Sequence, residues 1–450
     1  MLSVQPAEHM MISVIMPCRN GMPFLPWAVD DLASSSVALE VLICDDGSRD
    51  GSTEWLETLQ SRVENQVSAP TTPERSHAAL ETPTSDSPWV RQEPWIGEDS
   101  NPVPNPEEIA QKMRSRGHRF VLLKSDGRGQ GAAQNACLQA SSSSLIGLMD
   151  ADDRGEADRF EKLLDAMKEH PDWTAVCSQV RIFGTVSEGM NTYVNWQNGL
   201  LQPEELMQNR FVEIPALHQS GLYPRSLLLE TLNGYRDLPG WPIDIDTWMR
   251  LAEAGARIGK VPQQLYGWRQ HTLQSTRNHG RCGLDRLRNC KAHFLSRTLP
   301  PQVRRVEIWS TGRTLHGWKE ALQCQLAEKD QKLELALFNW QPKGRSRGGA
   351  QRKEGGGGAA ANATVKTEAE MEAESEQNVN GNSGYPKEDR EEEMFVEVTQ
   401  ASSPPPPLPE SEDLVVRVFA YGSHKVRDMA RSSSAAGGGS RWGCRDWPAA

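Results

Sequence analysis

The sequence predicts an α/β fold in which helices cover both faces of a mostly parallel sheet. Short apolar runs rich in β-branched residues indicate buried strands. They span residues 12–16, 40–44, 119–124, 145–149 and 174–183. Helix signals mark the segments between them, at 24–32, from 52 onward, 131–140 and 157–170. Strands that alternate with helices in this way favour a parallel sheet with helices on each side.

Composition narrows the class of protein. The 450 residues carry a formal net charge of -11, which argues against a general nucleic-acid binder because such proteins need a basic face. The hydrophobic fraction of 37% is low for a chain that is globular throughout. The length alone suggests two or three domains. Apolar residues concentrate in the first ~300 positions, whereas the last ~110 are mostly polar.

Cysteine usage and the N-terminus favour an intracellular protein. None of the eight cysteines forms a CxxC pair, which predicts reduced, mostly buried thiols rather than a zinc site or a disulfide framework. The first residues lack a basic segment followed by a long apolar one, and no apolar run reaches the ~18 residues of a membrane span. We therefore expect a soluble, cytoplasmic protein without a transmembrane segment.

The domain organisation follows the same pattern. Further strand candidates at 306–309, 333–339 and 414–420 predict a small α/β domain after the first one. Segments rich in Pro, Ser, Thr, Gly or Glu have too few apolar residues to fold and are expected to be disordered. The predicted division is a first domain at 10–295 with a disordered insertion at 62–115, a small α/β domain from 303–341 and 413–432, a low-complexity disordered insertion at 342–412 and a disordered tail at 433–450.

The segment LIGLMDADD at 145–153 carries the clearest chemistry. A buried strand delivers carboxylates to its C-terminal edge, where open α/β sheets bind ligands. Asp150 and Asp152, two positions apart, are suited to a hard divalent cation that also contacts a diphosphate. The alternative is a plain acidic loop at a helix start, with Asp153 interacting favourably with the helix dipole.

Two polar turns follow the first two strands. Asp45 and Asp46 come directly after the strand at 40–44, and PCRNG at 17–21 follows the first strand. A carboxylate at a strand end can accept hydrogen bonds from a nucleobase or a ribose hydroxyl, and Arg19 can face a nucleotide. The alternative is that Asp, Gly and Pro serve only the turns.

Seven segments in this order resemble the family-2 glycosyltransferases, which have the GT-A fold. They are ISVIMPCRNG (12–21), EVLICDDGSRDGS (40–52), GRGQGAAQNACLQAS (127–141), LIGLMDADD (145–153), HQSGLYPRSLLLETLNGYRD (218–237), PIDIDTWMRLAEAG (242–255) and YGWRQH (266–271). The resemblance implies an inverting transfer from a nucleotide sugar, commonly a UDP-sugar, to a hydroxyl of a glycan or other acceptor.

The resemblance also implies roles for single residues. The catalytic base maps onto Asp244, which would take the proton from the acceptor hydroxyl. Asp150 and Asp152, with His271, would hold Mn²⁺ or Mg²⁺; the alternative for His271 is an ordinary hydrogen-bonded residue. The nucleotide-sugar contacts map onto Pro17, Arg19, Asn20, Asp45, Asp46, Gly129, Asn135, Asp150 and Asp152.

Neighbouring polar residues have plainer interpretations. Asp246 and Arg250 lie four positions apart on a predicted helix, which favours an intrahelical pair. His218 is either a residue on the acceptor side or an ordinary loop histidine.

Two positions depart from the family pattern and keep a rival open. Ile243 stands where the family has a Glu before the base, and Gln134 replaces the Arg of an Ala-Arg-Asn segment. They motivate the alternative of a degenerate nucleotide-sugar-binding scaffold without transfer activity. A nucleotidyltransferase is a second rival, but it would usually carry a Gly-rich basic loop after the first strand, and PCRNG matches that poorly.

The C-terminal strands also resemble a known arrangement. IWSTGR, LALFNW and VVRVFAYGSHKVR are similar to the second, Rossmann-like domain of the eukaryotic UDP-GlcNAc:βGal β-1,3-N-acetylglucosaminyltransferase-like proteins. This resemblance implies UDP-GlcNAc as the donor.

Overall fold

The structure is a computed structural model that describes residues 11–64, 103–274, 279–299, 303–310, 312–327, 334–340, 398–401 and 414–419. Its main sheet has eight strands in the order β3-β2-β1-β4-β7-β6-β8-β5. The strands are β1 (Ile12–Cys18), β2 (Leu39–Asp45), β3 (Arg119–Lys124), β4 (Leu145–Leu148), β5 (Arg154–Gly155), β6 (Ala175–Gly184), β7 (Leu222–Pro224) and β8 (Ile258–Gln270).

Parallel pairing dominates this sheet. β1 pairs in parallel with β2 and β4, β2 with β3, and β6 with β8. β7 is antiparallel to β4 and β6, and β5 is antiparallel to β8. The predicted mostly parallel α/β sheet is therefore confirmed, and the five predicted strands are found with ends that differ by at most two residues.

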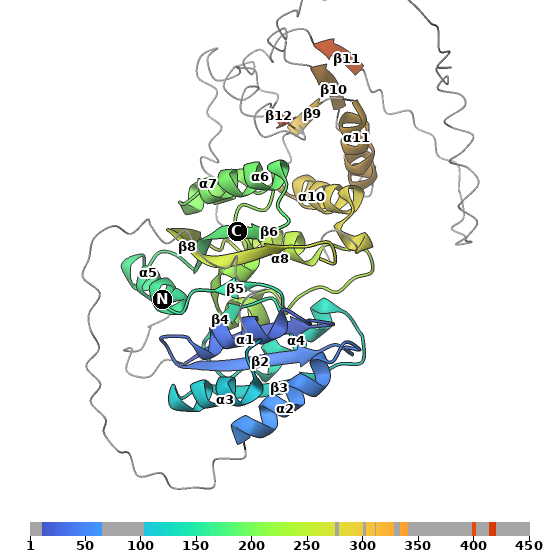
Figure 1. Cartoon of the computed structure of the whole chain (residues 1–450). Helices are drawn as coiled ribbons and strands as arrows, with labels where there is room; N and C mark the ends of the chain where they lie inside the picture. The colour runs from blue at the N-terminus through green and yellow to red at the C-terminus, as the bar shows by residue number, and fades with distance from the viewer. Residues whose placement is uncertain are drawn as a thin grey trace, which may run out of the picture.

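Helices cover both faces of the sheet, as Figure 1 shows. They are α1 (Leu25–Ala33), α2 (Ser52–Glu64), α3 (Pro106–Ser115), α4 (Gln130–Ala140), α5 (Arg159–Glu169), α6 (Glu188–Asn198), α7 (Pro203–Asn209), the short turns η2 (His218–Ser220), η3 (Leu227–Thr231) and η4 (Gly280–Cys282), α8 (Ile243–Glu253) and α10 (Leu284–Thr298). Side chains of β1 alternate between two cores. Ile12, Val14 and Met16 pack with α1, α2, α3 and α5, whereas Ile15 packs with α4, η3 and α8.

A second sheet follows α10. Its four strands, in the order β11-β10-β9-β12, are all parallel: β9 (Val303–Ser310), β10 (Glu334–Trp340), β11 (Val398–Ala401) and β12 (Leu414–Phe419). Helix α11 (Gly312–Ala327) connects β9 to the neighbouring strand β10. This sheet lies at the opposite end of the molecule from α2 and α3 (Figure 1). Ala292 and Leu295 of α10 belong to its core, which also contains Val306 and Leu322.

Two expectations of disorder are wrong in part. Within the predicted insertion at 62–115, α3 forms because Asn105 caps it, its side chain accepting a hydrogen bond from Glu108 N, and because Ile109 and Met113 are fully buried against neighbouring helices. Within the predicted low-complexity insertion at 342–412, β11 pairs with β10. Residues 62–64 form the end of α2 and 103–105 precede α3. Residues 65–102, the rest of 342–412 and the tail at 433–450 lie outside the described residues.

The burial of the cysteines matches the prediction from the sequence. Cys18, Cys44, Cys137, Cys177 and Cys290 are buried free thiols, as predicted. Over the described residues, no helix combines the length and apolar character needed to cross a lipid bilayer.

His218 occupies a buried position beside the main sheet. Its Nδ1 atom lies 3.1 Å from the Tyr223 hydroxyl, and its Nε2 atom lies 3.0 Å from the Tyr235 hydroxyl. The side chain is fully buried, and burial lowers the pKa of His218 to about 3. Of the two alternatives for this residue, the structure favours a packed, neutral histidine over one exposed to an acceptor.

The packing of α3 yields a first prediction. Ile109→Ala leaves a cavity between α3 and its neighbours, so we expect it to lower the free energy of unfolding by about 2–5 kcal/mol. Gln111→Ala changes an exposed residue of the same helix and should have little effect. Urea unfolding of both variants checks this, and equal stability of Ile109→Ala and the wild type would contradict the packing of α3.

A second prediction concerns acid. The pKa of His218 is about 3 in the folded chain and 6.5 when unperturbed. Between these two pH values, His218 is therefore protonated in the unfolded chain but neutral in the folded one. Below pH 6.5 the wild type should therefore lose stability faster than His218→Gln, by about 1.4 kcal/mol per pH unit. Urea unfolding at pH 7, 6 and 5 measures the difference, and parallel pH profiles would contradict burial of a neutral His218.

Candidate active site

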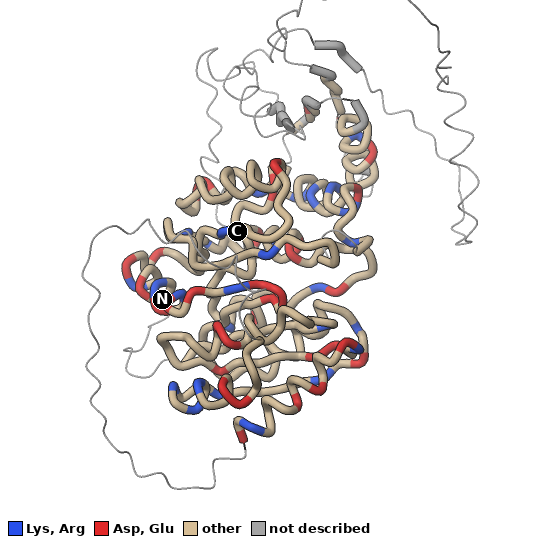
Figure 2. Tube along the Cα trace, in the orientation of Figure 1, with Lys and Arg blue, Asp and Glu red and all other residues tan. Residues whose placement is uncertain are grey.

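The carboxyl ends of β1, β2 and β4 bring three predicted segments to one edge of the sheet. These strands are parallel, so the loops that begin at Arg19, Asp46 and Met149 leave on the same side. The first and third loops touch, since a Cβ atom built at Gly21 would lie 3.4 Å from the Ala151 Cβ atom. Figure 2 shows acidic positions near the middle of the molecule, between the part built on β1 to β3 and the part built on β6 and β8.

The loop after β4 is fixed by β8. Asp153 is almost completely buried, and its carboxylate accepts hydrogen bonds from the Tyr266 hydroxyl at 2.7 Å and from the Arg269 backbone N–H at 2.8 Å. The Arg269 side chain donates to the Asp152 carbonyl oxygen at 2.6 Å. Asp153 is therefore a structural residue of the loop, while the carboxylates of Asp150 and Asp152 take no part in these bonds.

Asp150 and Asp152 fit a divalent cation. Oxygens of Asp150, Asp152 and Asp153 lie within 4.8 Å of one another, and those of Asp153 already accept hydrogen bonds. Burial, then the charges of Asp152 and Asp244, raise the pKa of Asp150 well above its ordinary value. Such mutual repulsion between hard oxygen ligands is what a divalent cation relieves. The residues thus match the chemistry of Mn²⁺ or Mg²⁺.

His271 lies at the edge of this cluster. Its Nε2 atom is 2.9 Å from Asp152 Oδ2, and its ring packs against Phe24 with centroids 5.0 Å apart. The contact brings His271 to the predicted site. A ligand role for it stays a prediction.

Asp244 stands at the start of α8 with an unsatisfied oxygen. Its Oδ1 atom is buried and has no hydrogen-bond partner among the described residues. Burial raises the pKa of Asp244, whereas the Gln219 side chain and the Arg281 charge act in the opposite direction. Asp244 also contributes to the raised pKa of Asp150, so the two carboxylates lie close enough for their charges to interact.

Asp246, two residues on, behaves differently. It is fully buried and accepts a hydrogen bond from Trp241 Nε1 at 2.8 Å, with Arg236 at 3.3 Å and Arg250 at 3.5 Å. The predicted intrahelical pair of Asp246 and Arg250 is confirmed. Of the two acids, Asp244 alone has an oxygen left for a ligand.

Asp45 and Asp46 follow β2 and differ in their bonding. Asp45 accepts hydrogen bonds from the hydroxyls of Ser48 and Thr53, each at 2.5 Å, so it closes its own loop. Asp46 reaches across to the next segment, where it accepts bonds from the Ser125 hydroxyl and from Gly129 N at 3.0 Å. The turn interpretation therefore explains Asp45, and Asp46 links the loop after β2 to the start of α4.

Residues after β1 complete this side of the site. Arg19 is 57% exposed and its guanidinium lies 3.7 Å from the Asp46 carboxylate, so it remains accessible to a ligand. Asn20 adopts φ 54° and bonds the loop after β2: its backbone N–H donates to Ser48 Oγ, and its side-chain oxygen accepts from Arg49 N. Pro17 lies opposite Cys44 of β2. Their predicted nucleotide contacts stay predictions.

Helix α4 carries the next predicted residues. Gly129 precedes the helix with φ 106°, a conformation that favours glycine. Asn135 uses its side chain to bond the backbone N–H and carbonyl of Tyr235, both at 2.8 Å, so the described contacts give it a structural role. Gln134 is fully buried, and neither polar atom of its side chain has a partner within the described part of the chain.

Ile243 belongs to the core. It is 3% exposed, and a Cβ atom at Gly131 would lie 3.3 Å from its Cδ1 atom. The residue that replaces the family's Glu therefore packs against the start of α4.

Four residues at the site went unrecognised in the sequence: Arg159, Gln219, Tyr266 and Arg269. Tyr266 and Arg269 lie in the matched segment YGWRQH, which was a usable signal. Arg159 is fully buried and donates to the carbonyl oxygens of Leu148, at 2.9 Å, and Gln219. Gln219 likewise lies in the segment 218–237 that carries the resemblance. No sequence pattern marks Arg159, because its partners are distant backbone carbonyl groups.

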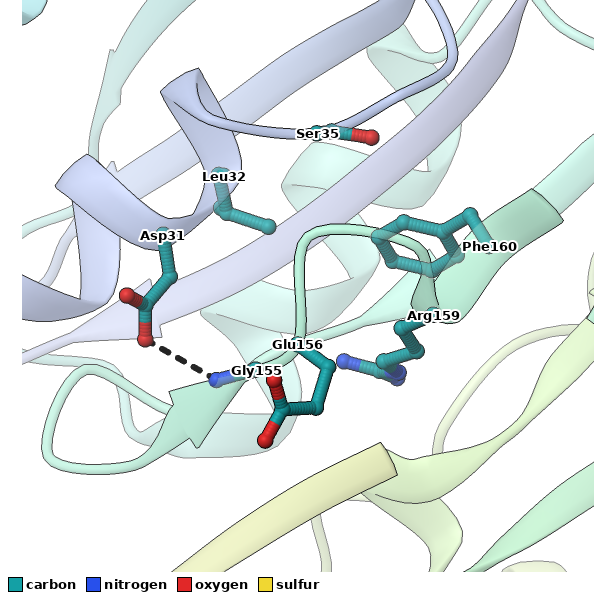
Figure 3. A pocket seen from close by; sticks show the side chains of 7 residues that line it. All are labelled: Asp31, Leu32, Ser35, Gly155, Glu156, Arg159 and Phe160. Atoms are coloured by element: carbon teal, nitrogen blue, oxygen red, sulfur yellow. Dashed lines mark hydrogen bonds between the residues drawn. The ribbon is translucent and has the colours of Figure 1, made fainter. Parts of the chain in front are cut away.

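A small hollow lies between α1, β5 and the start of α5, and neither Asp150 nor Asp244 lines it (Figure 3). In its wall, Asp31 accepts a hydrogen bond from Gly155 N at 2.9 Å and a second from Arg154 Nε at 2.6 Å, whereas Arg159 Nε is buried without a hydrogen-bond partner among the described residues. The bonds of Asp31 join α1 to β5.

Comparisons with known proteins agree with this geometry. Residues 13–75 and 86–229 match the model of the family described as glycosyl transferase family 2. An uncharacterized glycosyltransferase of Haemophilus influenzae is 28% identical over 138 residues, which are 31% of this chain and 49% of the relative. The chain thus spans about half the length of this curated relative.

Solved structures are more distant. S. aureus TarS 1–349 in complex with UDP-GlcNAc is 14% identical with a TM-score of 0.43, over 71% of this chain and 73% of that one. Mannosyltransferase PcManGT from Pyrobaculum calidifontis, in complex with GDP-Man and Mn²⁺, is 16% identical with a TM-score of 0.35, over 63% and 61%. At these TM-scores neither likeness bears on donor or metal. The matched residues include the acidic loop after β4, so this region is similar to glycosyl transferase family 2, and the mostly parallel sheet covered by helices is consistent with the GT-A fold.

Proposed function

We propose that this chain transfers a sugar from a UDP-sugar to an acceptor hydroxyl, with inversion at the anomeric carbon. The observation that carries the proposal is that Asp150 and Asp152, just after β4, are accompanied by Asp244, whose charge acts on Asp150 and whose Oδ1 atom is buried and has no partner among the described residues. The first two suit a metal-bound diphosphate, and the third suits a base.

The nucleoside end of the donor fits the edge formed by β1 and β2. The side chain of Asp46 is buried, and Arg19 beside it is exposed. Asp46 can accept a hydrogen bond from the nucleobase or the ribose, and Arg19 offers a positive charge to a phosphate. Gly129 brings the backbone at the start of α4 close to Asp46. The donor would therefore extend from Asp46 towards Asp150.

The metal, Mn²⁺ or Mg²⁺, would be held by Asp150 and Asp152, with His271 beside them. When bound, such an ion neutralises charge on a departing nucleoside diphosphate. Tyr266 and Arg269 hold the loop that presents these carboxylates, so the loop is ordered before any ligand arrives.

Asp244 is the proposed base. A sugar hydroxyl is a poor nucleophile until its proton begins to leave, so Asp244 takes that proton as the acceptor oxygen bonds to the anomeric carbon. The bond from that carbon to the diphosphate oxygen breaks, and the nucleoside diphosphate leaves with the electron pair. Burial raises the pKa of Asp244, which makes it a better proton acceptor than an ordinary exposed carboxylate.

N-acetylglucosamine as the transferred sugar rests on the resemblance of the C-terminal segments alone. The comparisons with known proteins support a glycosyltransferase of family 2 but not a specific relation to the eukaryotic proteins. A glycan acceptor likewise rests on the family.

A second candidate is a domain that binds a nucleotide sugar without transferring it. The observation that favours it is the pair of departures near α4: Gln134 has an unpartnered buried side chain, and Ile243 is a core residue. Donor binding without transfer to any acceptor, and without hydrolysis, would favour this candidate over the enzyme.

The metal proposal predicts that UDP binding depends on a divalent cation. Calorimetry should show UDP binding with Mn²⁺ or Mg²⁺, and Asp152→Asn should largely abolish it because one oxygen charge is lost. Asp165→Asn, at a position 56% exposed on α5, is the matched control and should bind UDP normally. Equal UDP affinity in EDTA would remove the metal from the site.

The base proposal predicts a rate effect without a binding effect. Asp244→Asn keeps the shape of the side chain but cannot take a proton, so transfer should fall by about 10²–10⁴ while UDP affinity stays nearly unchanged. Asp246→Asn should instead lower stability, because Asp246 is buried among Trp241, Arg236 and Arg250. Equal transfer rates in Asp244→Asn and the wild type would place the base elsewhere.

A further inference from the structure

Asp237 joins segments that lie far apart in the sequence. One of its carboxylate oxygens, Oδ2, accepts a hydrogen bond from Ala132 N, in the first turn of α4, at 3.3 Å. The other oxygen, Oδ1, accepts a hydrogen bond from Arg281 Nη1, in η4, also at 3.3 Å. Only 19% of the Asp237 side chain and 14% of the Arg281 side chain are exposed. Solvent therefore screens this ion pair less than it would screen a pair on the open surface.

The start of α4 leaves room for Asp237. A Cβ atom built at Gly131 would lie 2.8 Å from the Cβ atom of Asp237, and a Cβ atom built at Gly129 would lie 2.8 Å from its Oδ2 atom. A side chain at either position would therefore push Asp237 away from the helix. The two glycines admit the carboxylate to the start of α4, where the helix dipole stabilises a negative charge. Asp237 thus accounts for Gly131 without any contact to the donor.

The same joint reaches both halves of the proposed site. On the donor side, Gly129 N donates a hydrogen bond to Asp46 Oδ2 at 3.0 Å. On the base side, the Cδ1 atom of Ile243, which directly precedes Asp244, lies 3.3 Å from the position that a Cβ atom of Gly131 would take. The first turn of α4 is therefore the place where the segment that would hold the donor meets the segment that carries the proposed base.

We propose that Asp237 is a positioning residue for the transfer reaction: by holding Arg281 of η4 against the start of α4, it fixes the place of the base relative to the donor. The inference rests on the proposed function and adds a residue that acts through its neighbours rather than by touching a substrate. A displacement of about 1 Å between reacting groups can lower a rate by about 10²-fold, even when the change lies away from the reacting atoms. The contribution of Asp237 should therefore appear in kcat rather than in donor affinity.

The test measures the release of UDP from UDP-GlcNAc, UDP-glucose and UDP-galactose with Mn²⁺, with water as the acceptor, in the wild type and in Asp237→Asn. Asn keeps the size of the side chain and an acceptor oxygen for Ala132 N, but it loses the charge that pairs with Arg281. For the donor that the wild type uses, kcat should fall by about 10- to 100-fold. The KM for this donor should change by less than about threefold, because Asp150 and Asp152 keep their oxygens.

Further variants make the result decisive. Asp30→Asn is the matched control, because Asp30 is 21% exposed and joins α1 to α3 through an ion pair with Lys112 Nζ at 2.6 Å; it should leave kcat and KM unchanged. Arg281→Gln breaks the Asp237 pair from its other side and should lower kcat to a similar extent. The double variant should be no slower than the slower single one, because the two residues act as a unit. Arg281→Gln carries the test if Asp237→Asn does not fold.

The outcomes separate this inference from the proposed function. Equal kcat in Asp237→Asn and the wild type, or a loss confined to KM, would overturn the positioning role while leaving the transferase proposal intact. An equal fall of kcat in Asp30→Asn would also overturn it, because the loss of any partly buried ion pair would then account for the effect. A wild type that releases UDP from none of the three donors would overturn both.

Discussion

The site depends on one buried carboxylate, that of Asp153. Its two hydrogen bonds, from the Tyr266 hydroxyl and the Arg269 backbone, tie the loop after β4 to the end of β8. Burying a charge is unfavourable unless it is well paired, so the loop has little freedom to adopt another arrangement. Asp150 and Asp152 are consequently held just after β4. Asp244, at the start of α8, acts on the charge of Asp150 and completes a candidate site built from segments far apart in the sequence.

Much of this arrangement could be predicted from the sequence. Apolar runs identified the strands, and parallel pairing then required the loops carrying Arg19, Asp46 and Asp150 to lie at one edge. The same logic could not identify Arg159, whose partners are carbonyl oxygens of Leu148 and Gln219. Backbone groups carry no side-chain pattern, so a buried arginine of this kind looks like any charged residue on a helix face.

The wrong expectations have a common physical cause. The predictions of disorder were based on local composition, whereas tertiary contacts determine which segments fold. Helix α3 sits beside a long polar segment, yet Ile109 and Met113 find a buried place and Asn105 caps its start; the sequence Asn-Pro-Glu-Glu was a signal of that cap. Strand β11 exists because β10 offers it a parallel partner. At Asp45 the sequence was sufficient, because its hydrogen-bond partners are close in the sequence and the turn interpretation already described them.

Helix α10 belongs to both packed regions of the chain. Cys290 and Phe294 pack with Ile245 and Met249 of α8, while Ala292, Leu295 and Leu299 pack under the second sheet. If either packed region separated from α10, the apolar side chains on that side of the helix would be exposed to solvent. Heat or denaturant should therefore unfold the two regions together. A shortened chain that stops after α10 would expose an apolar stripe on this helix and should tend to self-associate.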